Sequence, residues 1–404
     1  MKKIFVLIIS AIMFSVTNAQ WTLQTIGTTT GLFGVCFTDA NYGTVVGTQG
    51  TILRTTNGGI TWITQISGTS YYLLDVNFTD LNNGTAVGDH GTVLRTSNGG
   101  IIWVSRSIQT ADILDGVSFS DANNGIVIGA SGFYKTTNGG TTWSAFQFYT
   151  NPILSWVSII DSETIIFVGY YGVIIRSNDA GISWSTQSSG TTNNLFSASF
   201  TDSNTGTAVG DNGTILRTTN GGITWVSQSS GTMNKLFSVS FTDANNGTAV
   251  GVNGTILKTT NGGITWTTQI SGTINNLHSV SFTDANNGIV VGDYGTILRT
   301  TNGGFTSVKE ENGLTIPKKF ILSQNYPNPF NPTTTINYSI PRQSYVTIKI
   351  YDALGREVST LVNEEKSIGN YTIEFNSSNL SSGIYFFQLK TAEFMQTKKM
   401  ILLR

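Results

Sequence analysis

A tryptophan recurs at an almost constant interval through the first three quarters of the chain, and this period restricts the possible folds more than any other feature. Successive tryptophans are 41, 41, 40, 41, 41 and 41 residues apart, and Ser307 stands where the next is due. They are Trp21, Trp62, Trp103, Trp143, Trp184, Trp225 and Trp266. Each interval contains four short runs of strand composition and no helical period. Units of this length with four strands form propeller blades, so the sequence predicts seven blades over residues 20–307.

The two ends of the repeat region predict how the ring closes. The first strand-like run, residues 21–26, has the composition of the end of a unit, whereas the last unit stops after residues 296–301. We expect the first strand to pair with the last blade, which removes an exposed sheet edge. An open solenoid would need polar caps on its terminal units, and neither end of the repeat has one. The predicted fold is an all-β, seven-bladed β-propeller closed by the N-terminal strand.

Composition excludes several classes of function. Only 11% of the 404 residues are charged and the formal net charge is -1, which argues against a disordered chain and against nucleic acid as a partner. Cys36 is the one cysteine, and His90 and His278 are the only histidines. These counts exclude a disulfide framework and any cysteine-rich or histidine-rich metal cluster. We therefore expect no cofactor and no metal.

The N-terminus has the pattern of a secretory signal peptide. Lys2 and Lys3 precede an apolar run from Ile4 to Val16, and small residues then lead to Ala19. The run is shorter than the ~18 apolar residues of a membrane helix. We expect residues 1–19 to be removed after Ala19, leaving a secreted chain without a membrane span.

The turn before each tryptophan is nearly invariant. It reads T-T-N-G-G-I-T-W from Thr55, with close copies at Thr96, Thr136, Thr218, Thr259 and, without the tryptophan, Thr300. We expect a structural hairpin in which the Asx side chain bonds the backbone two residues on, glycine has positive φ and tryptophan covers the turn. The motif resembles the Asp-box of sialidase-type repeats, with Asn mostly in the Asp position. The fuller pattern, G-T-I-L-R-T-T-N-G-G-I-T-W, resembles the photosystem II assembly factor-like propellers, which implies a fold rather than a function.

The repeat ends at Ser307, and the composition then changes. Residues 308–319 are polar enough for a linker, and alternating runs between 320 and 404 predict a small antiparallel β-sandwich. The words N-Y-P-N-P-F-N-P, I-Y-D-A-L-G-R and S-G-I-Y-F resemble the type A C-terminal sorting domain of the type IX secretion system. The motif residues are Pro327, Asn328, Pro329, Phe330, Asp352, Gly355, Arg356, Gly383 and Tyr385. The resemblance implies export by the type IX machinery of a Bacteroidota-type bacterium and a secreted or cell-surface location; the alternative is an ordinary sandwich that binds a ligand.

One basic and one acidic residue also recur in every blade. The basic residues are Arg54, Arg95, Lys135, Arg176, Arg217, Lys258 and Arg299. The acidic residues are Asp39, Asp80, Asp121, Asp161, Asp202, Asp243 and Asp284. If the strands alternate up and down, both sets lie at one end of the ring. We expect them to form ion pairs rather than a basic ring for an anionic ligand, because an unpaired charge between packed blades is costly.

The variable loops indicate where a ligand could bind. The T-D-A-N-N-G and T-N-G-G loops barely change, whereas the other two loops of each blade differ strongly, and alternation places both variable sets on one face. We expect that face to bind a ligand, since positions that differ between blades do not serve the blade itself. The candidate residues are Tyr71, Tyr72, His90, Tyr149, Trp156, Tyr170, Tyr171, His278 and Tyr294. Trp156 has two interpretations: it projects into the central channel, or it fills space in a degenerate blade.

Three classes of function remain open. We favour a non-catalytic binding module for an extracellular protein or glycan, because the sequence contains no acid/base, metal or phosphate-binding motif. The sialidase-type boxes keep a glycosidase as an alternative, although Glu163 is the one glutamate between Trp21 and Ser307. A purely structural surface component would explain the regular repeat without any ligand.

Overall fold

A computed structural model describes residues 20–24, 26–129, 132–148, 152–305, 317 and 319–403. The chain divides into two compact units between residues 307 and 308. Regular structure in the described part is β-strand, apart from five 3-10 turns of three residues each. The predicted signal peptide and most of the predicted linker lie outside the described residues.

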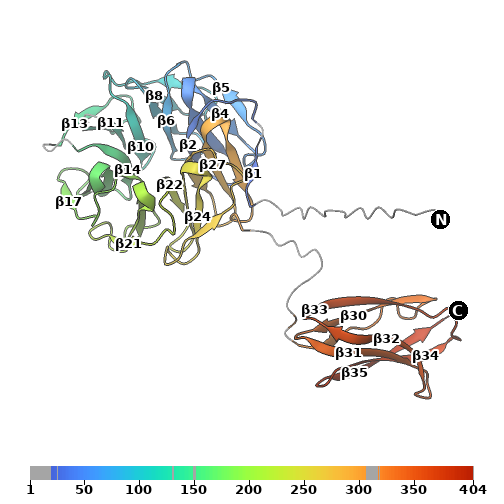
Figure 1. Cartoon of the computed structure of the whole chain (residues 1–404). Helices are drawn as coiled ribbons and strands as arrows, with labels where there is room; N and C mark the ends of the chain where they lie inside the picture. The colour runs from blue at the N-terminus through green and yellow to red at the C-terminus, as the bar shows by residue number, and fades with distance from the viewer. Residues whose placement is uncertain are drawn as a thin grey trace, which may run out of the picture. The chain divides into compact units, whose positions relative to one another are not determined.

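Seven four-stranded antiparallel sheets form the first unit and are arranged as blades around a ring (Figure 1). Neighbouring innermost strands pack against one another, and β2 packs against β26, so the ring is complete. The seven-bladed propeller predicted from the tryptophan period is confirmed. The innermost strands are β2 (Leu32–Phe37), β6 (Leu73–Phe78), β10 (Leu114–Phe119), β14 (Leu154–Ile159), β18 (Leu195–Phe200), β22 (Leu236–Phe241) and β26 (Leu277–Phe282).

The remaining strands of each blade follow outward from the centre. The second strands are buried along their whole length, which explains their G-T-A-V-G-like composition. They are β3 (Gly43–Gly47), β7 (Gly84–Gly88), β11 (Gly125–Gly129), β15 (Thr164–Gly169), β19 (Gly206–Gly210), β23 (Gly247–Gly251) and β27 (Gly288–Gly292). The third are β4 (Ile52–Thr55), β8 (Val93–Thr96), β12 (Gly132–Thr136), β16 (Ile174–Asn178), β20 (Ile215–Thr218), β24 (Ile256–Thr259) and β28 (Ile297–Thr300). The outermost are β5 (Ile63–Gln65), β9 (Val104–Ser105), β13 (Ser144–Phe146), β17 (Ser185–Gln187), β21 (Val226–Gln228), β25 (Thr267–Gln269) and β1 (Thr22–Leu23).

A phenylalanine, a glycine and a tryptophan pack together in most blades. In blade six the Phe241 ring lies edge-on to the Trp266 ring, with centroids 5.9 Å apart. A Cβ on Gly247 would lie 2.4 Å from the Phe241 ring, so only glycine leaves room for it. The repeated tryptophan therefore holds the outermost strand against the innermost one.

The N-terminal strand completes the last blade, as predicted (Figure 1). Thr22 of β1 pairs with Arg299 of β28, and Leu23 pairs with Leu298. Trp21 is 2% exposed, and its Nε1 donates to Gln269 Oε1 over 2.9 Å. Both ends of the propeller sequence thus contribute to one sheet, which leaves the last blade no free outer edge at β28.

Side chains lining the central channel connect each blade to the next. In most of the innermost strands the fifth residue accepts the backbone N–H of the sixth residue of the following blade. The Oγ of Ser240 accepts the N–H of Phe282 at 3.3 Å, and the Oγ of Ser281 accepts the N–H of Phe37 at 3.2 Å, across the closure. Asn77 does the same for Phe119. The frequent serines of these strands are therefore structural.

The predicted ion pairs between the periodic basic and acidic residues are wrong. The ion pairs that the described residues form include no member of either set. Each carboxylate accepts N–H groups of its own loop instead, as Asp39 Oδ1 does from Asn41 at 2.7 Å. Arg217 Nη2 donates to the Ala244 carbonyl of the next blade at 2.7 Å. Backbone groups lie nearer to both charges than the charges lie to each other, and they satisfy both.

The T-N-G-G turn also differs in one detail from the prediction. The φ of Gly58 is +68° and that of Gly59 is +81°, and Trp62 contacts Gly59, as expected. The side chain of Asn57, however, accepts the N–H of Thr61, four residues on, at 3.0 Å. Two consecutive left-handed glycines lengthen the turn, so the amide two residues on is not the one that the side chain meets.

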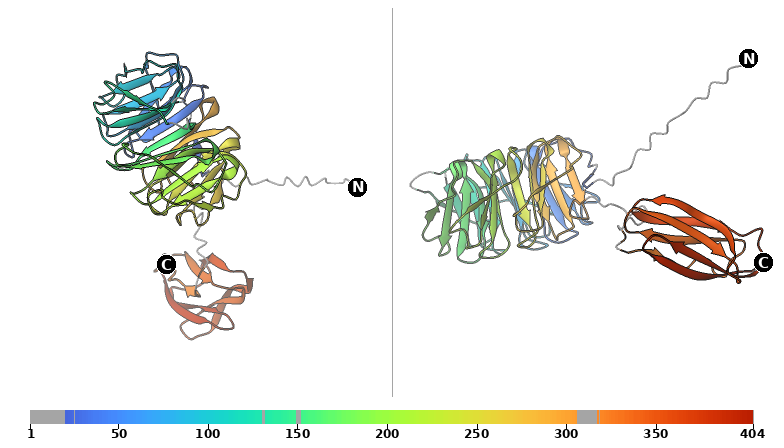
Figure 2. Two further views of the ribbon diagram at one scale, coloured as in Figure 1. Left: turned by 90° about the vertical axis from the view of Figure 1, so that its left-hand side faces the viewer. Right: turned by 60° about the horizontal axis from the view of Figure 1, so that its bottom comes forward.

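The second unit is a sandwich of two antiparallel sheets, as predicted (Figure 2). One sheet has the order β29 (Ile321–Leu322), β30 (Thr333–Ile340) and β33 (Gly369–Asn376). The other has the order β32 (Glu357–Lys366), β31 (Ser344–Tyr351), β34 (Gly383–Lys390) and β35 (Met395–Leu402). Its core includes two of the predicted sorting-motif residues, Phe330 and Tyr385.

Two other motif words form turns of this sandwich. Asp352 Oδ1 accepts the N–H groups of Leu354 and Arg356, and its Oδ2 lies 2.7 Å from Arg356 Nε. Gly355 has a φ of +76°, which favours glycine. The Pro-rich word supplies a further contact, because Asn328 Oδ1 accepts the N–H of Ile401 at 2.9 Å. These sequence motifs therefore have structural roles in the turns and the packing of the sandwich.

Candidate functional site

The two variable loops of each blade meet on one face of the ring, as the alternation of strands predicts. The N–H of Asp211 donates to the Asn194 carbonyl, and the N–H of Tyr170 donates to the Ile153 carbonyl, each at 2.9 Å. On the opposite face, the N–H of Gly58 donates to the Asn41 carbonyl and joins the two invariant loops. We call the first face the variable face.

A cavity of about 260 Å³ opens at the centre of the variable face. We call it the mouth cavity. Every blade contributes the second residue of its innermost strand to the lining. These residues are Phe33, Leu74, Asp115, Ser155, Phe196, Phe237 and His278.

A bulge at the start of each innermost strand places these side chains. The register of β22 against β23 shifts between Leu236 and Ser238, so Phe237 has no partner in the ladder. The same shift occurs in all seven innermost strands. A bulged residue leaves the strict alternation of the strand and can point along a new direction. The bulge thus directs seven residues of five different types toward one opening.

Aromatic rings line most of the mouth cavity. Centroid distances are 6.2 Å from Tyr170 to Phe196, 5.9 Å from Phe196 to Phe237, and 5.2 Å from Phe237 to His278. Phe33 continues the series at 5.2 Å from His278. We call these five rings the aromatic arc. The candidate residues predicted from the sequence include only Tyr170 and His278 among them, because phenylalanine recurs at this position in three blades.

Trp156 forms the boundary between the mouth cavity and the channel below it. Its side chain lines both the mouth cavity and a deeper space of about 340 Å³. The indole Nε1 donates to Ser158 Oγ at 3.2 Å. Trp156 also packs against the core between blades four and five. Trp156 therefore both borders the central channel and fills space between two blades, as the two interpretations of the sequence proposed.

Two carboxylates that the sequence-based list omits lie at the same cavity. Asp75 is 7% exposed, and its carboxylate accepts the N–H of Val76 at 2.8 Å and of Val117 at 2.9 Å. Burial raises the pKa of Asp75 to about 7. The pKa of Asp115 is raised to about 6, mainly by desolvation and to a smaller extent by repulsion from Asp89. Their departure from the repeat was a usable signal, because blades six and seven have serine where blade two has Asp75.

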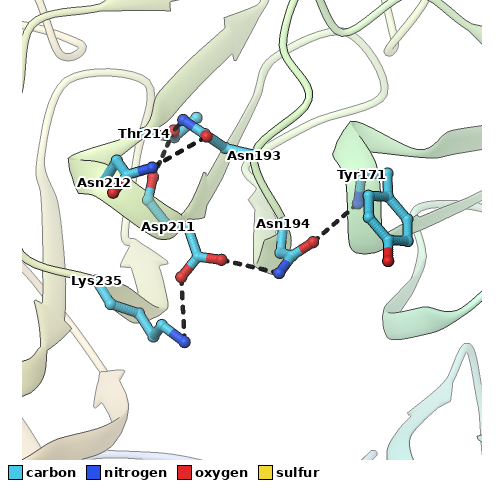
Figure 3. Close-up of polar contacts among 7 residues, drawn as sticks. All are labelled: Tyr171, Asn193, Asn194, Asp211, Asn212, Thr214 and Lys235. Atoms are coloured by element: carbon cyan, nitrogen blue, oxygen red, sulfur yellow. Dashed lines mark hydrogen bonds and ion pairs between the residues drawn. The ribbon is translucent and has the colours of Figure 1, made fainter.

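A polar network fixes the rim beside the aromatic arc (Figure 3). The N–H of Tyr171 donates to Asn194 Oδ1 at 2.9 Å, and Asn194 Nδ2 donates to Asp211 Oδ2 at 2.8 Å. Asp211 Oδ1 lies 3.1 Å from Lys235 Nζ. The Lys235 ammonium lies over the Phe196 ring, 4.9 Å from its centroid. The network links blades four, five and six, and it neutralises the lysine locally.

The other predicted residues surround this opening to different extents. Tyr171, Tyr294 and His90 have φ near +56° at the position where blades five and six have Asn212 and Asn253. A bulky residue in this conformation is unusual, and the two tyrosines are each 74% exposed. Such exposed aromatic rings are typical of contact surfaces.

Three predicted residues lie toward blades one and two, and one lies outside the described residues. Tyr71 stacks on His90 with centroids 4.3 Å apart. Tyr72 lies 6.3 Å from Phe33 and so extends the aromatic arc. Tyr149 is not among the described residues, so its position is not tested.

The described residues contain no cluster of three or more His, Cys, Asp or Glu side chains that could hold a metal ion. None of the helices in that part of the chain has the length and apolar content needed to cross a membrane. Another hollow, of about 580 Å³, lies on the outer part of blade five. Its lining includes Thr214 and Ser230, which recur in blade six as Thr255 and Ser271. The residues that line this hollow therefore follow the repeat, whereas those that line the mouth cavity differ between blades.

Comparison with known families assigns both units. Residues 63–192 and 223–314 match the family described as photosynthesis system II assembly factor YCF48, and residues 324–403 match the secretion system C-terminal sorting domain. The propeller match covers more than half of the 404 residues. The sorting domain implies use of the type IX secretion system and a secreted or cell-surface protein. No curated protein matches the sequence.

Solved structures share the propeller fold. A structure of YCF48 bound to D1 peptide is 20% identical, with a TM-score of 0.60 over 70% of this chain and 97% of that one. PorZ, an essential surface component of the type IX secretion system of Porphyromonas gingivalis, is 12% identical, with a TM-score of 0.53 over 94% of this chain and 60% of that one. The GH74 enzyme of Niastella koreensis is 12% identical, with a TM-score of 0.58 over 94% and 74%. The neighbours include an enzyme, so the fold alone does not decide whether the chain is one.

Proposed function

Because the chain belongs to the photosynthesis system II assembly factor YCF48 family and ends in a secretion system sorting domain, we propose that it is an extracellular, non-catalytic binding protein. Its N-terminal signal peptide and its C-terminal domain would direct it through the type IX secretion system of a Gram-negative, Bacteroidota-type bacterium. Its propeller would bind a protein or glycan on the variable face.

One observation carries the binding proposal: exposed or half-buried aromatic side chains gather around one cavity at positions where the repeat is not conserved between blades. Tyr171 and Tyr294 are largely exposed around it, although the conformation there suits asparagine better. Strained residues persist where surrounding structure and function retain them. The opposite face, which we call the constant face, differs, since its invariant Asp and Asn side chains form hydrogen bonds within the repeat.

The carboxylates of the cavity favour binding over glycoside hydrolysis. A glycosidase needs one carboxyl group free to exchange a proton and a second free to attack or to activate water. Both oxygens of Asp75 already accept backbone N–H groups, one of which belongs to the next blade. Asp75 is thus not available as the free acid or nucleophile that hydrolysis requires. The GH74 neighbour nevertheless makes a glycosidase the alternative to test.

The test is a binding screen of the full mature chain against peptide, glycan and outer-membrane protein libraries. The peptide library has priority, since a YCF48 structure is described as bound to a peptide. The triple variant Trp156→Ala, Tyr170→Ala and Tyr171→Ala should keep its circular dichroism spectrum and lose at least about tenfold in affinity, because aromatic anchors dominate most interfaces. A matched control changes the constant face, with Ile182→Ala, which is 86% exposed.

Three outcomes would contradict the binding proposal. Turnover of a fluorogenic sialoside or of a glucan, lost in Asp115→Asn, would establish the glycosidase alternative. Equal binding by the triple variant and the control would place the ligand elsewhere, and no ligand in any format would favour a structural role.

Export has a separate test. Deletion of residues 320–404 in a host with a functional type IX system should leave the propeller in the periplasm. Surface labelling of the truncated protein would contradict this part of the proposal.

A further inference from the structure

The chemistry of the mouth cavity indicates which kind of group fits it, and this inference rests on the proposed binding function. The aromatic arc lines the cavity with rings, and the π-face of such a ring attracts cations. Asp75 and Asp115 add carboxylate oxygens to the lining. In the described part of the chain, neither carboxylate forms an ion pair with a basic side chain. The cavity therefore combines two features that both favour positive charge.

The basic side chains already near the cavity are each paired with a carboxylate. Lys235 is held by Asp211, and His278 Nε2 lies 2.7 Å from Asp293 Oδ1. Lys235 also shows that the rings of the arc accept an ammonium group, since its Nζ lies within 6 Å of the Phe196 and Phe237 centroids, at 4.9 and 5.8 Å. Asp75 and Asp115 are left as the carboxylates of the lining without a cationic partner.

The carboxylate of Asp75 is also unnecessary for the fold. It accepts the N–H of Val117 in the next blade. In blades six and seven the equivalent contacts are made by Ser238, which accepts from Val280, and Ser279, which accepts from Val35, each at 3.3 Å. Serine thus performs the structural task without a buried charge, and burial raises the pKa of Asp75 to about 7. A carboxylate that destabilises the fold more than a serine at the same position would is typical of a functional site.

The size of the cavity restricts the ligand further. Sites that enclose a whole small molecule usually measure ~300–1,000 Å³, and the mouth cavity measures about 260 Å³. It suits one side chain of a larger partner, whose remaining surface would rest on the exposed rim tyrosines. A planar guanidinium both stacks on aromatic rings and donates to carboxylates, which an ammonium does less well.

We propose that the mouth cavity receives one arginine side chain from a protein partner, with the guanidinium between the aromatic arc and the carboxylates of Asp75 and Asp115. The arginine is the anchor of the interface, and the rim residues Tyr171 and Tyr294 contact the residues that flank it. A neutral sugar stacked on the rings and a calcium ion on the carboxylates are the competing occupants.

The experiment uses the full mature chain labelled with 5-fluorotryptophan. The chain has eight tryptophans, and Trp156→Phe identifies the resonance of the one that lines the cavity. N-acetyl-arginine methylamide should shift that resonance, whereas the neutral isostere N-acetyl-citrulline methylamide should not. Asp115→Asn should weaken the arginine probe at least about fivefold. Glu163→Gln, which removes a charge on the constant face, should leave it unchanged.

The outcomes separate the proposal from its competitors. Should Asp115→Asn fail to fold, Asp115→Ser replaces it, because blade four has Ser155 at this position. An equal response to citrulline and arginine, a response to calcium chloride or a glucan oligosaccharide alone, or no shift with any probe overturns the proposal. A protein partner found in the screen whose binding survives Asp115→Asn leaves the proposed function standing and overturns only the arginine anchor.

Discussion

Replacing Asp75 with serine should stabilise the propeller at neutral and alkaline pH. The carboxyl group is 7% exposed, and burial raises its pKa from 3.8 to about 7. Because the folded pKa lies above the unfolded one, the folded state binds more protons between these values, and the free energy of unfolding decreases as the pH rises through this range. Above about pH 7 the free energy of unfolding does not decrease further from this cause.

The magnitude follows from the shift of about three pKa units. At 1.36 kcal/mol for each unit, ionisation of Asp75 costs the folded state ~4 kcal/mol at pH 8. Serine would keep the hydrogen bond to Val117, as Ser238 does with Val280, and would lose that from Val76, which is worth ~1 kcal/mol. We expect a net gain of ~3 kcal/mol for Asp75→Ser at pH 8 and little difference near pH 4.

The assay is urea denaturation followed by tryptophan fluorescence from pH 5 to pH 9. All eight tryptophans lie between Trp21 and Trp266, so the signal reports on the propeller alone. The difference between the variant and the natural protein should grow by a little over 1 kcal/mol per pH unit up to pH 7 and then level off. Parallel curves, or a variant less stable at pH 8, would refute the assignment of Asp75 as a buried and costly carboxylate.

Three further changes test the packing of the ring. Deletion of residues 20–27 exposes the edge of β28 and should cause aggregation, measured by light scattering; a monomeric, cooperatively folding product would contradict the closure. Lys258→Arg should stabilise the propeller by ~1 kcal/mol at pH 7. Lys258 is buried, and its Nζ lies 3.4 Å from Thr248 Oγ1. At the equivalent position of blade five, Arg217 donates to Thr207 Oγ1 and to the Ala244 carbonyl, each at 2.7 Å. Burial lowers the pKa of Lys258 to about 8, so this gain should shrink as the pH rises from 8 toward 10.5, and a constant gain would mean that the pKa of Lys258 is not lowered in the folded state. Ser240→Ala removes the acceptor of the Phe282 N–H and should cost ~1–3 kcal/mol in chemical denaturation, whereas an unchanged midpoint would mean that the inter-blade contact contributes nothing.

Much of the architecture could be predicted from local pattern. The 41-residue tryptophan period reports a repeating hairpin unit, and the strand-like run at Trp21 reports a missing fourth strand. Each of these two signals is carried by neighbouring residues or by the number of repeats. They can therefore be recognised without knowing which residues are close together in space. The sorting-type sandwich was predictable for the same reason, because its turn words encode local backbone geometry, as at Asp352 and Gly355.

The periodic charges show where this reasoning fails. Arg217 and Asp202 were correctly placed at one end of the ring, but proximity in a repeat does not decide which acceptor is nearest. Asp202 Oδ1 accepts the N–H of Asn204 at 2.7 Å, and Arg217 reaches the carbonyl of Ala244. Hydrogen bonds are short and directional, so the choice of partner depends on positions that only the packed blades define.

The sequence by itself thus determined the number of blades, the closing strand and the face on which the variable loops lie. Only the tertiary structure decided that the side chains of Phe33, Phe237, Asp115 and Ser155, from four different blades, converge on one cavity. The physical reason is the bulge at the second residue of each innermost strand, which breaks the alternation that a sequence pattern assumes. Closure of the ring then brings those redirected side chains to one axis, although up to 204 positions separate them in the chain.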